Sequence, residues 1–249
     1  MDGEKLFFLM PAYNAALTVS AVFDRIPDSV DSLIHRYVVV DDGSTDDTAL
    51  AVEGVERCSS RIDLLRHKEN RGYGAAVKTL LDHAQAHGAD ICVVVHADGQ
   101  YPPEMIPLLS APLRENRADM VQGSRLLGGG ALDGGMPLYK YLGNRFLTFL
   151  ENRAFGFDLA EYHSGYMLYH RRALKAIAYR RFSDSFDFDL EMLVASGILD
   201  LRLQELAIPT RYGDEVSHLN PFRYGLDVLR VIRRYRRGDY HRLLGEGDE

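Results

Sequence analysis

Short apolar runs alternate with stretches of helical periodicity along the first half of this chain of 249 residues. The runs are bounded by turn residues, which is typical of buried strands. They predict strands at 6–10, 37–40, 62–65, 91–95 and 120–121, with helices at 17–26, 48–57, 73–87 and 102–117 between them. Because such alternation favours a mainly parallel sheet with helices on both faces, the sequence predicts an α/β fold.

A glycine-rich stretch at 126–137 interrupts this pattern and predicts a loop beside a functional site. Beyond it we expect helices at 139–155, 171–179 and 188–196, a strand or turn at 166–169 and a strand at 201–208. The chain shows no internal repeat. We predict one domain over residues 1–220, followed by a basic amphipathic segment over 221–249.

Composition excludes several classes of protein. Apolar residues make up 46% and charged residues 26% of the chain, which excludes disorder and a coiled coil. No apolar stretch reaches the roughly 18 residues that a membrane span needs. Cys58 and Cys92 are the two cysteines, so neither a disulfide scaffold nor a zinc cluster is expected. Together with the lack of a signal-peptide pattern, these features predict a cytoplasmic protein.

Charge is distributed unevenly along the chain. The formal net charge of −7 argues against a nucleic-acid binder, but 223–242 carries seven arginines against two aspartates. On a helix over 226–237, one side gathers Val228, Val231, Ile232 and Tyr235, and the other Arg230, Arg233, Arg234 and Arg237. This pattern fits a helix on an anionic membrane and equally a helix docked on the acidic body. The aromatic helix at 139–155 likewise fits either a membrane interface or the core.

Polar side chains follow the predicted strands, at the edge where parallel sheets bind ligands. The loop after the second strand reads Asp41-Asp42-Gly43-Ser44-Thr45-Asp46. A carboxylate there can accept hydrogen bonds from a ribose or a base, and Ser44 or Thr45 can cap the next helix. An ordinary turn with a helix cap explains the same residues. The first strand lacks a Gly-x-Gly-x-x-Gly turn, which argues against a dinucleotide fold.

After the fourth strand, Asp98 and Gln100 offer oxygen ligands two residues apart, and His96 precedes them. Such a loop suits a hard divalent cation that bridges two phosphates and neutralises a diphosphate leaving group. The alternative is a turn, which Gly99 favours.

Further positions each have a functional and a structural interpretation. Gly72 allows close backbone approach to a ligand, or serves only helix packing. Arg125 can bind a phosphate or pair with an acid. Asp189 and Glu191, at a predicted helix start, can supply a general base or only offset the helix dipole.

Four motifs, in this order, resemble the family-2 glycosyltransferases, and most closely the branch of dolichyl-phosphate mannose and glucose synthases. They are Pro11-Ala12-Tyr13-Asn14, Val38-Val39-Val40-Asp41-Asp42-Gly43-Ser44-Thr45-Asp46, Asn70-Arg71-Gly72-Tyr73-Gly74-Ala75-Ala76 and Ala97-Asp98-Gly99-Gln100-Tyr101-Pro102-Pro103-Glu104. The resemblance covers residues 6–212. It implies a GT-A fold, a UDP- or GDP-sugar donor, a divalent cation (Mg²⁺ or Mn²⁺) and inversion at the anomeric carbon.

By this resemblance, Pro11, Ala12 and Tyr13 line the nucleoside pocket, and Asp41 holds the base or ribose. Asp42, Gly72 and Arg125 complete the expected nucleotide-binding set. Asp98 belongs to the metal-binding Asp-x-Asp, with Gln100 as a further ligand.

The chain departs from that motif at one position, where His96 replaces the first aspartate. Imidazole binds Mn²⁺ but is a poor ligand for Mg²⁺. Three interpretations stay open: Asp98 and Gln100 suffice, Mn²⁺ is preferred with His96 as a ligand, or metal dependence is weak.

The resemblance also points to residues near the sugar and the acceptor. Ser164 lies in the segment that borders the sugar, and Glu191 matches the acidic helix start near the acceptor better than Asp189 does. Further candidate contacts to the diphosphate or an acceptor phosphate are Lys140, Arg145, Arg211 and His218. The branch indicates a polyprenyl phosphate, which is already ionised and needs no base, whereas a hydroxyl acceptor benefits from one.

Two other classes of function remain open. His96 motivates a non-catalytic scaffold or sensor that binds a nucleotide sugar. A sugar-1-phosphate nucleotidyltransferase is less favoured, because its glycine-rich loop after the first strand is not matched by residues 11–14. A lipid acceptor predicts peripheral association with the inner face of the cell membrane.

Overall fold

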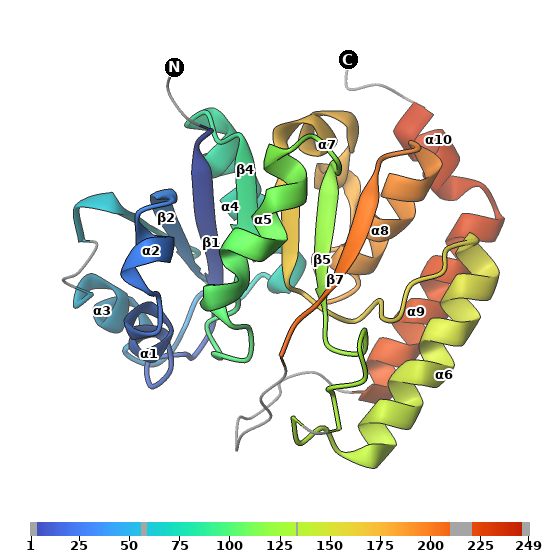
Figure 1. Ribbon diagram of the computed structural model, residues 1–249, viewed down its shortest axis with the longest axis horizontal. Helices are drawn as coiled ribbons and strands as arrows, with labels where there is room; N and C mark the ends of the chain where they lie inside the picture. Colours follow the sequence, from blue (N-terminus) through green and yellow to red (C-terminus); the bar gives the residue numbers. More distant parts are fainter. Residues whose placement is uncertain (1–3, 56–58, 133, 210–220, 246–249) are drawn as a thin grey trace.

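The computed structural model describes residues 4–55, 59–132, 134–209 and 221–245. Its centre is a seven-stranded sheet in the order β3-β2-β1-β4-β6-β5-β7 (Figure 1). The strands are β1 (Leu6–Ala12), β2 (Ile34–Asp41), β3 (Ile62–Arg66), β4 (Ile91–Val94), β5 (Met120–Ser124), β6 (Met167–His170) and β7 (Leu203–Ala207). All neighbours are parallel except where β6 pairs with β4 and β5. The predicted, mainly parallel α/β sheet is confirmed.

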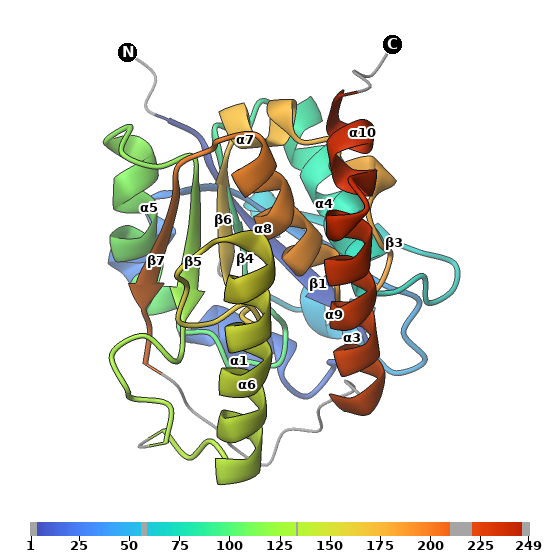
Figure 2. The same ribbon diagram turned by 90° about the vertical axis from the view of Figure 1, so that its right-hand side faces the viewer.

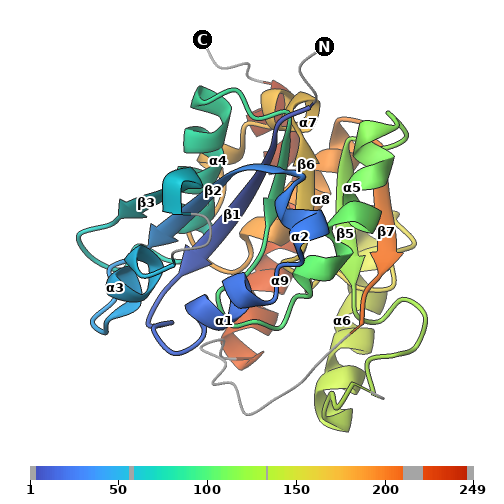
Figure 3. The same ribbon diagram turned by 60° about the vertical axis from the view of Figure 1, so that its left-hand side comes forward.

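Helices cover both faces of the sheet. One face carries α1 (Val19–Asp24), α2 (Asp28–Asp31), α3 (Thr48–Glu53) and α5 (Ile106–Arg114), which come forward in Figure 3. The other carries α4 (Tyr73–Ala86), α7 (Arg171–Ala176) and α8 (Phe188–Ile198). On the flank beyond α8 lie α6 (Leu138–Phe155), α9 (Pro221–Arg236) and α10 (Asp239–Gly245) (Figure 2). Short 3₁₀ helices occur at Ser59–Arg61, Pro103–Met105 and Tyr179–Arg181.

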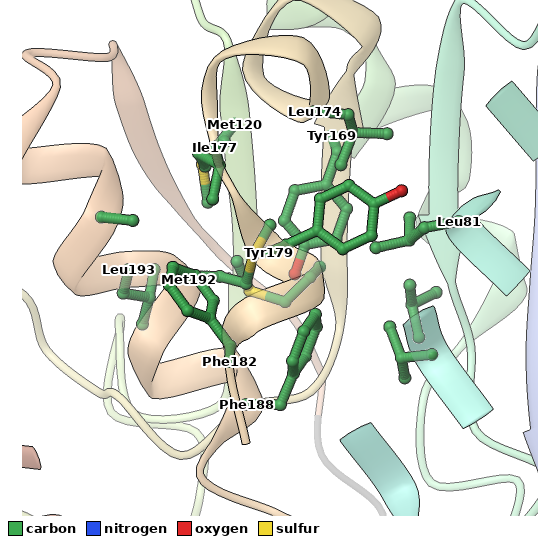
Figure 4. Packing of buried hydrophobic residues seen from close by; sticks show 14 of the residues in the cluster. Leu81, Met120, Tyr169, Leu174, Ile177, Tyr179, Phe182, Phe188, Met192 and Leu193 are labelled. Carbon is green, nitrogen blue, oxygen red and sulfur yellow. The ribbon is translucent and has the colours of Figure 1, made fainter. Parts of the chain in front are cut away.

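Strand periodicity divides the core into two layers. Phe7 and Leu9 of β1 pack with Leu80 of α4, whereas Phe8 and Met10 belong to the opposite layer. Successive side chains of a strand point to opposite faces, and both faces here are covered, so the strand is apolar throughout. Figure 4 shows the α4 and α8 layer, where the labelled residues include Leu81, Tyr169, Phe182, Phe188 and Met192.

Most predicted elements occur with small shifts of their ends. The predicted helix at 102–117 is divided into a 3₁₀ turn at Pro103–Met105 and α5. α2 was not predicted, and α10 is a separate helix within the segment 221–249 that was predicted as a basic amphipathic helix or tail. α2 is a single turn with one buried side chain, Val30, which is too short for a periodic signal. α10 follows Gly238, whose φ of +73° ends the preceding helix.

The C-terminal helix α9 packs its apolar side against the protein. Val228, Val231 and Ile232 are buried in the same core as β1 and α4. Of the two interpretations of this helix, docking on the body therefore accounts for its apolar face. The division at residue 220 stays a prediction. Within the described residues, no helix combines the length and apolar character needed to cross a bilayer.

Candidate functional site

Two loops interlock where β1 and β2 end. The backbone N–H of Asn14 donates to Ser44 Oγ at 2.9 Å, and Thr45 N–H donates to Asn14 Oδ1 at 2.9 Å. Asn14 has φ +49°, a left-handed conformation that Asn tolerates. Neither Ser44 nor Thr45 caps α3; Asp46 Oδ1 accepts from Thr48 N–H instead, because Ser44 and Thr45 are engaged with Asn14. These contacts hold the carboxyl ends of two central strands together.

Tyr13 is exposed beside this edge, whereas Asp41, the last residue of β2, is buried. Asp41 Oδ1 accepts from Ser44 N–H at 3.0 Å, and its other oxygen has no partner among the residues that the structure describes. Tyr13 is 37% exposed, and Pro11 and Ala12 are the last residues of β1 before it. The four residues expected to line a nucleoside pocket are therefore adjacent, with one carboxylate oxygen able to accept a ligand hydrogen bond.

Asp42 is bound by the chain itself. Its carboxylate accepts from His67 Nδ1 at 2.5 Å and from the backbone N–H groups of Arg71 and Gly72 at 3.0 and 2.9 Å. Gly72 has φ +99°, and a Cβ there would lie 2.4 Å from the carbonyl oxygen of Asp184. The structure thus uses Gly72 for packing, and contact of Asp42 or Gly72 with a nucleotide stays a prediction.

The Asp98 loop is ordered by its own turn and by α1. Asp98 Oδ1 accepts from Gln100 N–H at 3.0 Å, and Arg25 donates to the carbonyl of Gly99 at 2.7 Å. Beside the loop is a cleft of about 220 Å³ lined by Arg25, Gln100, Pro102, Glu104, Met105 and Pro209. Both the predicted turn and a half-buried carboxylate are therefore present.

A divalent cation fits this loop only together with a phosphate ligand. Among the described residues, no three His, Cys, Asp or Glu side chains cluster closely enough to hold a metal ion. Mg²⁺ sites commonly use one or two carboxylates, with substrate phosphates and water completing the shell. Asp98 offers one such carboxylate, so the residues present are compatible with a cation that enters with a diphosphate.

His96 lies in a hydrogen-bonded chain with Tyr73 and Asp189. His96 Nε2 is 3.0 Å from Tyr73 Oη, which donates to Asp189 Oδ2 at 2.7 Å. The imidazole also meets Tyr73 and Tyr101 edge-on. Because Nε2 is engaged with Tyr73, a cation could bind this atom only if that contact broke. The contact concerns Nε2 alone, so the assignment of Asp98 and His96 as metal ligands stays a prediction.

Burial shifts the pKa values of His96 and Asp189, the two ends of this hydrogen-bonded chain. It lowers the pKa of His96, with the positive charge of Arg125 acting in the same direction and Asp98 opposing it. It raises the pKa of Asp189 to about 7, against hydrogen bonding that lowers it, and within the described residues the buried Asp189 Oδ1 has no hydrogen-bond partner. Gly165 leaves room for the imidazole, since a Cβ there would lie 2.5 Å from it.

Arg125 pairs with an acid, Glu161, which agrees with the structural interpretation of this residue. Its Nε donates to Glu161 Oε1 at 2.9 Å, its Nη2 donates to the same carboxylate, and its Nη2 also donates to the carbonyl of His163. Glu161 is fully buried. Ser164 is also turned inward, because its hydroxyl donates to the carbonyl of Gly123. A phosphate or sugar could contact these two side chains only after they exchanged partners.

Glu191 and Asp189 face different parts of the structure, and the preference for Glu191 near the acceptor stays a prediction. Glu191 is fully buried and accepts from Arg234 Nη1 and Tyr240 Oη, both at 2.5 Å. It therefore faces α9 and α10, whereas Asp189, two residues earlier on α8, faces Tyr73 and the sheet edge. Two residues correspond to about 200° of helix rotation, so the two side chains point in opposite directions.

The remaining candidates lie on α6 or outside the described residues. Lys140 and Arg145 are on α6, where Arg145 is exposed and Lys140 half-buried. Arg211 and His218 fall within 210–220, outside the described residues.

Sequence reasoning missed three residues that organise the site. His67 bridges Asp42 and Thr79, Tyr73 joins His96 to Asp189, and Glu161 holds Arg125. Tyr73 carried a signal, since it begins a helix within a motif at the carboxyl edge. His67 and Glu161 carried none, because their partners lie far away in sequence.

The amino-acid sequence is similar to those of known proteins. The family described as Glycosyl transferase family 2 matches residues 7–178. The UDP-N-acetylglucosamine–dolichyl-phosphate N-acetylglucosaminyltransferase of Methanococcus voltae is 27% identical over 85% of this chain and 88% of that protein. The dolichol-phosphate mannosyltransferase of Pyrococcus furiosus is 34% identical over 55% of this chain and 38% of that protein.

A solved structure shares the fold. Glucosyl-3-phosphoglycerate synthase from Mycobacterium tuberculosis, solved with Mn²⁺, UDP and phosphoglyceric acid, matches with a TM-score of 0.65 at 19% identity. The match covers 93% of this chain and 75% of that one. At this identity the likeness concerns the fold.

Proposed function

Since the chain belongs to glycosyl transferase family 2, we propose that it transfers a sugar from a nucleotide-diphosphate donor to a polyprenyl phosphate, with inversion at the anomeric carbon. The supporting observation is that the Asp41 and Asp98 loops follow β2 and β4, the two parallel neighbours of β1, at the same carboxyl edge of the sheet. This edge is where open α/β sheets bind their ligands.

In this proposal the β1 and β2 loops bind the nucleoside. Pro11, Ala12 and Tyr13 provide its walls, and the unpartnered oxygen of Asp41 accepts a hydrogen bond from the ribose or the base. The Asn14 and Ser44 contacts keep these groups in place before the donor arrives, which lowers the ordering cost of binding.

Asp98 directs the diphosphate toward the reaction centre. A bound Mg²⁺ or Mn²⁺ would neutralise negative charge on the leaving diphosphate. Asp98 contributes one oxygen to that cation, and Gln100 N–H and Arg25 hold the loop in the required shape. His96 acts through Tyr73 as a positioning residue behind the loop.

An ionised lipid phosphate fits the protonation of the site. Asp189 is buried and hydrogen-bonded to Tyr73, so it would have to leave this contact before it could take a proton from a hydroxyl acceptor. A phosphate acceptor is already anionic and attacks without a base. The relatives named for dolichyl-phosphate and dolichol-phosphate transfer support this class of acceptor, and such a lipid requires peripheral contact with a membrane.

The first test is thermal unfolding with UDP, GDP, UDP-glucose, UDP-GlcNAc and GDP-mannose, each with Mg²⁺, Mn²⁺ or EDTA. A ligand at 100 times its Kd adds about 2.7 kcal/mol of stability. We expect a metal-dependent shift with one nucleotide series. No shift with any of them would contradict the donor site.

Asp98→Asn should then reduce transfer to polyprenyl phosphate about 100-fold or more, because the cation contributes several kcal/mol of charge stabilisation. The matched control is Asp24→Asn, an exposed position at the end of α1. Equal activity of the two variants would exclude Asp98 as the ligand. Binding of nucleotide without any turnover would favour a sensor instead.

A further inference from the structure

Helix α6 exposes a continuous apolar stripe. Five large side chains on its outward side are between 58% and 69% exposed: Leu138, Tyr139, Leu142, Phe146 and Phe149. At 100° per residue they lie within about 100° of one another around the helix. The opposite side is buried through Thr148, Glu151 and Phe155. An exposed apolar surface of this kind is typical of an interaction site.

The charges around this stripe are positive. Arg145 and Arg153 are the exposed charged residues on the outward side of α6, and its one acid, Glu151, is fully buried. On α9 the exposed residues are Arg223, Leu226, Leu229, Arg230, Arg233 and Arg236. The acid of α9, Asp227, pairs with Arg230 at 2.6 Å. The two helices therefore combine exposed apolar side chains with a net positive charge.

The position of these helices relates them to the candidate site. α6 and α9 contact each other and lie side by side on one flank of the molecule (Figure 2). The first turn of α6 lies at the end of the molecule toward which the parallel strands point (Figure 1). The start of the stripe and the Asp98 loop therefore lie toward the same end of the molecule.

We propose that the outward faces of α6 and α9 form a docking surface for an anionic lipid bilayer. Apolar and aromatic side chains of α6 enter the interfacial region, while the arginines of both helices contact the headgroups. The proposal rests on the proposed function, since a polyprenyl phosphate acceptor is available only at a membrane. A second copy of the chain fits less well, because a symmetric contact would bring the same arginines together.

The experiment is flotation of the full chain with vesicles of phosphatidylcholine alone or with added phosphatidylglycerol, both free of polyprenyl phosphate. We expect binding to the anionic vesicles that weakens as salt is raised. The triple variant Leu142→Ser, Phe146→Ser, Phe149→Ser should lower the partition coefficient about tenfold or more, because it removes interfacial apolar area. Arg233→Ala with Arg236→Ala should weaken binding to anionic vesicles only.

The control is Leu108→Ser on α5, which is 53% exposed and lies away from α6 and α9, and it should bind as the unmodified chain does. Equal vesicle binding by the triple variant would overturn the proposal. So would an unmodified chain that shows the nucleotide-dependent thermal shift and does not float. A dimer in solution that the triple variant dissociates would assign the stripe to a second copy. The thermal shift with nucleotide needs no membrane. A missing shift would therefore contradict the proposed donor site, and it would be distinguishable from a failure to bind vesicles.

Discussion

The hydroxyl of Tyr73 joins two side chains that sequence motifs assign to different tasks. His96 occupies a metal-ligand position and Asp189 an acidic helix start, yet both bond to the same oxygen atom. With a pKa near 7, Asp189 exchanges its proton close to neutrality. Tyr73 Oη can therefore donate to an ionised Asp189 or accept from a protonated one. In both cases Nε2 of His96 is hydrogen-bonded to Tyr73.

Asp189 should make stability depend on pH. Its pKa rises from 3.8 to about 7 on folding, so the folded state holds a proton that the unfolded state has released in this interval. The contribution of Asp189 thus falls as pH increases from about 4 to 7, by at most roughly 4 kcal/mol. Asp189→Asn removes this pH-dependent contribution. The unfolding free energy of the variant, measured with urea, should therefore increase relative to that of the unmodified chain as pH rises from about 4 to 7.

Asp200→Asn is the control for this measurement, because Asp200 is exposed and its φ of +51° suits Asn equally well. It should leave the pH profile of the unfolding free energy unchanged. A profile for Asp189→Asn parallel to that of the unmodified chain would show that the Asp189 carboxyl is ionised throughout.

At the scale of elements, one buried carboxylate ties three helices together. Glu191 of α8 accepts from Arg234 of α9 and from Tyr240 next to the start of α10, and it also accepts from the backbone N–H of Ser183. Burial raises the pKa of Glu191, and the hydrogen bonds and Arg234 oppose that shift. The acid that resembled an acceptor-side group is thus the anchor of the C-terminal helices.

Arg234→Ala should destabilise the protein, because it leaves Glu191 buried without its cation. Breaking a buried pair costs about 3–5 kcal/mol, and since Arg234 is 32% exposed we expect the lower end of that range. The double variant Glu191→Gln, Arg234→Ala should lose less than the sum of the single losses in urea unfolding. Strict additivity would mean that the two side chains do not interact.

For the whole molecule, the C-terminal helices complete a shared core. Val228, Val231 and Ile232 are buried together with side chains of α4 and α8, and Tyr240 packs on Phe182. Burying three such aliphatic side chains stabilises a protein by roughly 5–9 kcal/mol. That is comparable with the total stability of a domain, about 5–15 kcal/mol.

A chain cut after residue 220 should therefore fail to fold cooperatively, although the sequence pattern places a boundary there. Circular dichroism during thermal unfolding, with size-exclusion chromatography, measures this directly. A sharp transition and a monomeric elution volume for residues 1–220 would support an independent domain instead.

Sequence patterns alone were enough to predict the order of strands and helices along the chain, and with it the sheet edge to which Asp41 and Asp98 belong. These features depend on local hydrophobic periodicity and on the rule that parallel strands end at one edge. They were predictable because neighbouring residues carry the whole signal.

The partners of the polar side chains, in contrast, became known from the three-dimensional packing. Tyr73 and Asp189 are 116 residues apart, Arg125 and Glu161 are 36 apart, and Glu191 and Arg234 are 43 apart. Whether a carboxylate faces a ligand or an arginine depends on what packs opposite it, and no local pattern contains that information. The same reason explains why α9 buries its apolar side while α6 exposes part of its own.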